Sequence, residues 1–133
     1  TAFSRQLAYE DLGPGSSVII YSFARDLIEV AENYLAFFVD ESCGQCTPCR
    51  DGNVVLLNGV RALLNGQCSR RYWDELLSLG KTIQLTSRCG LGQSSPKILL
   101  AINEYFHSEI EAHLSAEIID DGVHIAQHAA RST

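Results

Sequence analysis

Four of the five cysteines constrain this chain more than any other feature, because their spacing predicts one site whose residues come together only when the chain folds. Cys43, Cys46 and Cys49 follow one another at intervals of three residues, and Cys89 comes from a distant segment. One tight loop would thus offer three thiolates and a second loop one. This pattern is typical of a cubane of four irons, each of which takes one sulfur from the protein. The first hypothesis is a single [4Fe-4S] cluster.

Other cysteine chemistries fit the spacing less well. A structural zinc ion usually takes two pairs of ligands from two loops, and three thiolates from one loop reach poorly around one small ion. A disulfide framework requires an oxidising compartment and would leave one of the five cysteines over. A thioredoxin-like Cys-x-x-Cys would accompany a βαβ pattern, which the sequence does not display. Zinc and thiol chemistry stay as alternatives to the cluster.

The residues that follow Cys49 argue for one cluster and not two. A two-cluster ferredoxin would continue with a fourth cysteine and a proline, but here Arg50, Asp51, Gly52 and Asn53 follow. The fifth cysteine, Cys68, lies between the two ligand groups, and the set of four is complete without it. We interpret it as a thiol near a helix end that behaves as a small buried hydrophobe. A thiol redox sensor that pairs Cys68 with a ligand cysteine is the less favoured alternative.

Composition predicts one compact domain that binds neither nucleic acid nor an anionic membrane. The 133 residues are 46% hydrophobic, enough for one moderate core. Ten basic against sixteen acidic residues leave a net charge of −6, which lacks the basic surface that such partners need. No apolar run is long enough to insert into a membrane, and no secretory segment opens the chain, so we expect a cytoplasmic location. The start at Thr1 and the lack of methionine favour a fragment over a separate subunit.

Hydrophobic periodicity predicts a mainly α fold, a four-helix bundle with a short β segment before it. Val18 to Tyr21 are expected to form a strand that ends a β-rich upstream domain, residues 1–21. The helical domain with the cluster at one end is expected at residues 22–115, and a tail of unknown role at 116–133. The four helices are expected at residues 22–40, with Ser22 as N-cap, at 51–65, at 69–80, where Gly80 interrupts the pattern, and at 95–114, where Ser95 and Pro96 open the helix.

This order of helices explains how the cysteines would meet. The loop with Cys43, Cys46 and Cys49 joins the first two helices and Cys89 lies between the last two, so both loops occupy the same end of an antiparallel bundle. Glycines 44, 90 and 92 would let the backbone approach the cluster, and their amides would donate to its sulfurs. The charges of Arg50 and Arg88 would either offset the negative cluster or remain in solvent.

The two cysteine segments resemble a known family. Residues 41–52 and 86–92 are similar to the iron-sulfur domain at the C-terminal end of the NADH-oxidising, flavin-bearing subunit of respiratory complex I. The same domain occurs in NAD-dependent formate dehydrogenases and in the diaphorase subunits of NAD-reducing nickel-iron hydrogenases, and residues 87–96 look closest to the hydrogenase branch. The resemblance covers roughly residues 18–114. It implies that Cys43, Cys46, Cys49 and Cys89 ligate a [4Fe-4S] cluster that takes electrons from flavin, and that the β segment ends a ubiquitin-like domain.

The resemblance also implies what this chain does not do alone. In the family, FMN and NAD(H) bind upstream, and the glycine-rich phosphate-binding segments expected there are absent from this sequence. The expected role is therefore electron transport within an oxidoreductase, with the flavin part and other iron-sulfur subunits as partners and no catalysis by this chain itself. The alternative is a structural or assembly module stapled by zinc or by a redox-inert metal site.

The four histidines are weaker candidates for a site. His107 and His113 lie on the last predicted helix among acidic residues, a pattern more typical of a solvated helix face than of a metal site. His124 and His128 are four residues apart, but the residues around them make a helix uncertain. No role is assigned to them.

Overall fold

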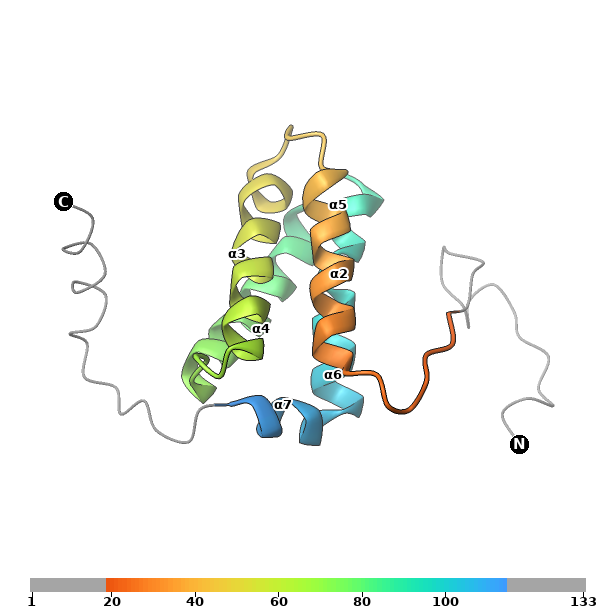
Figure 1. Cartoon of the computed structure of the whole chain (residues 1–133). Helices are drawn as coiled ribbons and strands as arrows, with labels where there is room; N and C mark the ends of the chain where they lie inside the picture. The colour runs from red at the N-terminus through yellow and green to blue at the C-terminus, as the bar shows by residue number, and fades with distance from the viewer. Residues whose placement is uncertain (1–18, 115–133) are drawn as a thin grey trace, which may run out of the picture.

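The computed structural model describes residues 19–114, and this range forms six helices and contains no strand (Figure 1). Figure 1 shows α2 and α3 side by side and antiparallel, with α4 packed against α3 and α7 crossing the end opposite the α2–α3 loop. None of the helices in this range is long and apolar enough to cross a membrane. The helices are α2 (Leu27–Asp40), α3 (Thr47–Leu64), α4 (Arg70–Thr86), α5 (Gly90–Ser94), α6 (Lys97–Tyr105) and α7 (His107–His113).

The core lies between α2, α3, α4 and α6. Trp73 on α4 is its largest fully buried side chain, and its indole N–H donates to Asn103 Oδ1 on α6 at 3.0 Å. Two glycines on α3 permit its close approach to α4, because a Cβ at Gly52 would overlap Ile83 and one at Gly59 would overlap Leu76. The buried apolar residues include Ile28, Ala31, Leu35, Leu56, Val60, Leu63, Leu76, Ile83, Leu99 and Ile102.

The mainly helical class is confirmed, but the predicted strand is not observed in the part of it that the structure describes. Ile19, Ile20 and Tyr21 form no strand and are exposed, whereas Val18 lies outside the described residues. A lone extended segment has no neighbour with which to pair its backbone groups. The predicted domain boundaries fall near or beyond the ends of the described range and stay predictions.

The first helix begins later than its apolar pattern indicated. Leu27 is its first residue, and Asp26 is the N-cap, with Oδ1 accepting from the Ile28 amide at 2.7 Å. Ser22 Oγ instead accepts from the Ala24 amide in a preceding turn. Asp26 also lies 3.0 Å from Nε2 of His113, so the same carboxylate caps α2 and contacts α7. This second partner is a tertiary contact that periodicity does not report.

The second and third helices are longer than predicted. α3 begins at Thr47 rather than near Asp51, with Pro48 in its first turn, which places Cys49 inside the helix. α4 begins close to the predicted position, with Ser69 as its N-cap, but it passes through Gly80 and ends at Thr86. Gly80 is buried in the helix, and a Cβ there would lie 3.2 Å from Pro96. It therefore serves close packing and does not end the helix.

The predicted fourth helix is divided, so the simple four-helix arrangement is not observed. The short helix α5 lies before the predicted segment, and Ser95 is its C-cap. Pro96 is the N-cap of α6 rather than its first residue. Phe106 then separates α6 from α7 with φ −131° and ψ 43°, outside the helical region. His124 and His128 lie outside the described residues.

Candidate metal centre

All four cysteines predicted as ligands line one cavity of about 100 Å³. Cys43 lies in the α2–α3 loop, Cys46 is the N-cap of α3, and Cys49 lies in the first turn of that helix. Cys89 is the N-cap of α5, at the same end of the molecule. Cys49 is buried, while Cys43 and Cys89 are exposed. The remaining lining residues are Glu41, Ser42, Gln45 and Leu91.

The Cys46 sulfur is the point where the two loops meet. The pKa of its thiol is lowered, first because the backbone amide of Arg88 donates to the sulfur, and then because the amide of Cys49 does so. The positive charge of Arg88 acts in the same direction, while desolvation acts against it. The N-terminus of α3 also carries a partial positive charge that favours an anion there. These groups stabilise the thiolate, which is the form that binds metal.

Two polar side chains that the cysteine spacing did not indicate lie close to the Cys49 sulfur. Ser42 Oγ lies 3.4 Å from it, and Asn53 Nδ2 donates to it, also at 3.4 Å. Asn53 Oδ1 in turn accepts from Ser95 Oγ at 2.6 Å. A signal for Asn53 existed in the sequence, since it is the polar member of the apolar repeat on α3 formed by Cys49, Leu56, Val60 and Leu63.

The two arginines have different roles at the centre. Arg50 donates to the Asp51 carboxylate and, through Nη1, to the Gly44 carbonyl at 3.1 Å, so it fastens the cysteine loop. Its pKa is raised, chiefly by the hydrogen bond and charge of Asp51. Arg88 acts on Cys46 as described. Gly44 itself has φ +74°, a conformation that side chains rarely adopt, which explains the glycine in this turn.

Gly92 brings α5 into contact with the cysteine loop. A Cβ at this position would lie 2.5 Å from Ser87 Oγ, closer than real Cβ atoms approach, and 3.0 Å from Cys49 Cβ, which is tighter than most real contacts. At Gly90, by contrast, a Cβ would meet nothing within 4 Å. Of the three glycines near the cysteines, only Gly44 and Gly92 are therefore required by geometry in this structure.

The donor set fits a polynuclear group better than a single ion. Within residues 19–114, no three His, Cys, Asp or Glu side chains converge closely enough to hold one metal ion. Four thiols that line one cavity suit the donor chemistry of a cubane, in which each of the four irons takes a separate sulfur from the protein. Asn53, and backbone amides such as that of Arg88, supply donors to those sulfurs.

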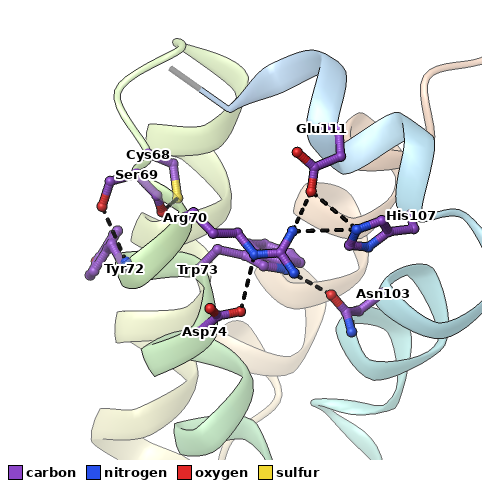
Figure 2. A network of polar contacts seen from close by, with 9 residues as sticks. All are labelled: Cys68, Ser69, Arg70, Tyr72, Trp73, Asp74, Asn103, His107 and Glu111. Carbon is purple, nitrogen blue, oxygen red and sulfur yellow. Dashed lines mark hydrogen bonds and ion pairs between the residues drawn. The ribbon is translucent and has the colours of Figure 1, made fainter. Parts of the chain in front are cut away.

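Cys68 lies at the other end of α3 and does not line the cavity. Its side chain is fully buried, its thiol lies 3.6 Å from the Ser69 carbonyl oxygen, and desolvation raises its pKa to about 11. Figure 2 shows it beside the start of α4, where Arg70 contacts Asp74 and Glu111. The interpretation of Cys68 as a small buried hydrophobe agrees with this position.

The two described histidines make helix contacts. His107 Nε2 lies 3.1 Å from Glu111 on its own helix, in the network of Figure 2. His113 Nε2 reaches Asp26 at 3.0 Å and ties α7 to α2. No metal-binding group forms around either of them within the described range.

Comparisons with known proteins agree with this centre. The profile of the NADH-ubiquinone oxidoreductase-F iron-sulfur binding region, a [4Fe-4S] family, matches residues 29–113. The NAD-reducing hydrogenase HoxS subunit alpha of Cupriavidus necator is 44% identical over 102 residues, which are 77% of this chain and 17% of that protein. An NADH-quinone oxidoreductase protein of Rickettsia conorii is 32% identical over 116 residues, which are 87% of this chain and 27% of that protein.

A solved structure has the same fold. The crystal structure of NAD⁺-reducing [NiFe]-hydrogenase in the H₂-reduced state aligns with a TM-score of 0.70 and 28% identity, over 73% of this chain and 17% of that one. The chain thus spans between about a sixth and a quarter of the length of these relatives. The resemblance seen in the cysteine segments is confirmed, and this chain belongs to the family of the NADH-ubiquinone oxidoreductase-F iron-sulfur binding region.

Proposed function

We propose that this chain holds one [4Fe-4S] cluster through Cys43, Cys46, Cys49 and Cys89 and relays single electrons in an NAD(H)-linked oxidoreductase. The observation that carries the proposal is the cavity that these four cysteines line together. Three of the thiols come from the α2–α3 loop and the start of α3, and the fourth comes from the start of α5. When bound, such a cluster accepts and releases one electron at a time.

The protein's own contribution is to hold and tune this group. The amide and charge of Arg88 favour the thiolate at Cys46, and Asn53 donates to the sulfur of Cys49. Arg50 fixes the loop through the Gly44 carbonyl. No side chain in this role has to act as an acid, a base or a nucleophile.

The relatives suggest the place of this relay in a larger assembly. Their names describe components of NAD-reducing hydrogenase and NADH-quinone oxidoreductase, and the alignments cover most of this chain but only a small share of each relative. We infer that flavin and NAD(H) bind to other parts of the assembly and that electrons pass between flavin and further iron-sulfur clusters. A reducing compartment such as the cytoplasm keeps the thiols available for this role.

Low-temperature EPR on the anaerobically purified 133-residue chain tests the relay. Dithionite should produce a signal from the reduced cluster, and reoxidation should remove it. NADH alone should produce no signal, because the part that binds it is supplied elsewhere. A chain that contains zinc and stays EPR-silent through this cycle would refute electron transfer and favour the structural staple.

A further inference from the structure

Asn53 is a polar side chain in the apolar interior between α3 and the α5–α6 junction. It is fully buried, as is Ser95, its partner on the other side of that interface. Its amide nitrogen lies 3.4 Å from Cys49 Sγ, and its amide oxygen lies 2.6 Å from Ser95 Oγ. Ser95 Oγ is also 3.0 Å from the Gly92 carbonyl. The Gly92 carbonyl, the Ser95 hydroxyl and the Asn53 amide therefore form a series of buried polar contacts that ends at the Cys49 sulfur.

The negative charge of the sulfur decides which group donates and which accepts in this series of hydrogen bonds. A serine hydroxyl has one proton, so Ser95 can donate either to Asn53 or to Gly92. A metal-bound thiolate is negative and only accepts hydrogen bonds, so the amide must turn its NH₂ group toward Cys49. The Asn53 oxygen then faces Ser95 and needs the hydroxyl proton, because a buried acceptor without a donor is unfavourable. Ser95 thereby holds the amide in the one orientation that serves the sulfur.

We infer that Asn53, oriented by Ser95, is a positioning residue that donates to the Cys49 sulfur and raises the reduction potential of the cluster held there. This inference rests on the proposed function. A hydrogen bond to a ligand sulfur stabilises the more negative, reduced state more than the oxidised state. Ser42 also lies 3.4 Å from this sulfur, but it is only partly buried and accepts from the Gly44 amide as well. The water-excluded donor at Cys49 is Asn53.

The test is an EPR-monitored redox titration of the 133-residue chain, reconstituted anaerobically with ferrous iron and sulfide. Asn53→Ala should lower the midpoint potential, with the reduced-to-oxidised ratio at fixed potential falling by up to about tenfold, or about 59 mV for a one-electron couple. Ser95→Ala frees the amide to rotate and should shift the potential in the same direction by less. The iron and sulfide content should stay that of the wild type.

Asn103→Ala is the matched control. It also removes an asparagine hydrogen bond, that to Trp73, but at the part of the molecule shown in Figure 2 and not at the cysteine cavity. It should destabilise the fold without moving the potential. If Asn53→Ala does not fold, Ser95→Ala decides the question by itself.

The outcomes separate this inference from the proposed function. A reducible cluster whose potential is the same in the wild type and in Asn53→Ala, or in Ser95→Ala where that variant decides, overturns the role of Asn53 and leaves the relay intact. An upward shift overturns it too. If the wild-type chain takes up no iron and sulfide, the proposed function fails and the inference fails with it.

Discussion

Cys46 and Cys68 illustrate how surroundings divide one residue type into two chemical roles. At Cys46, amide donors and a nearby cation lower the thiol pKa and so favour the thiolate, the form that the proposed ligand role requires. At Cys68, desolvation raises the pKa to about 11 and keeps the thiol protonated. The sequence separated the two by spacing alone, and the structure supplies the physical reason. Asn53 and Ser95 were not found in this way, because the contact between them joins segments far apart in the sequence.

Cys68 should resist alkylation in the folded chain. With a pKa of about 11, only about one thiol in a thousand is ionised at pH 8, and the sulfur is buried as well. Iodoacetamide at pH 8 should therefore modify exposed Cys43 of the cluster-free chain but leave Cys68 unmodified, as read by peptide mass spectrometry. Because the folded pKa is raised, labelling of Cys68 should increase only as pH approaches 11.

The unfolded chain is the control for that experiment. In guanidinium chloride, Cys68 should react like the other cysteines at pH 8. Rapid modification of Cys68 in the folded chain would contradict its assignment and support the thiol sensor instead.

At the scale of the helices, periodicity located the helical segments but misplaced several of their ends. The ends depend on contacts that lie far away in the sequence. Asp26 caps α2 and also contacts His113, and Gly80 lies inside α4, where a Cβ would be 3.2 Å from Pro96. The short helix α5 was not predicted, since five residues are too few for a periodic pattern.

Gly92→Ala should displace α5 and weaken the metal centre. The added Cβ would overlap Ser87 and Cys49, and relief of that overlap moves the helix that begins after Cys89. We expect a loss of about 1–3 kcal/mol in the free energy of unfolding, measured by urea denaturation, together with reduced iron uptake.

Gly90→Ala is the matched control, because a Cβ there meets nothing within 4 Å. It should leave both stability and iron uptake close to those of the wild type. Equal effects of the two substitutions would show that the close contact of α5 with Cys49 is not the cause.

Asp26→Ala should cost at least about 1 kcal/mol of stability, because the Ile28 amide loses its acceptor at the N-terminus of α2 and His113 loses its partner on that helix. Urea denaturation of the variant measures this loss. Ser22→Ala should change stability little, since Ser22 lies in a turn before the helix. A larger loss of stability in Ser22→Ala than in Asp26→Ala would contradict this assignment and support the helix start at Ser22 that the sequence pattern indicated.

At the scale of the whole molecule, the fold brings two separate cysteine loops to one end of the helices. This meeting was predictable, because the loop order and the antiparallel direction of successive helices follow from the sequence. The short strand expected before the helices is not observed, because within the described residues no second strand lies beside residues 19–21. The cavity, its close contact at Gly92 and its buried donors required three-dimensional coordinates.

The most direct test of the central claim is the iron and acid-labile sulfide content of the anaerobically purified chain. We predict about four irons and four sulfides per chain, which Cys68→Ala retains and Cys89→Ser loses. Cys68→Ala is the matched control, because it removes a buried cysteine that does not line the cavity. Stoichiometric zinc without sulfide, or an intact cluster in Cys89→Ser, would contradict the account.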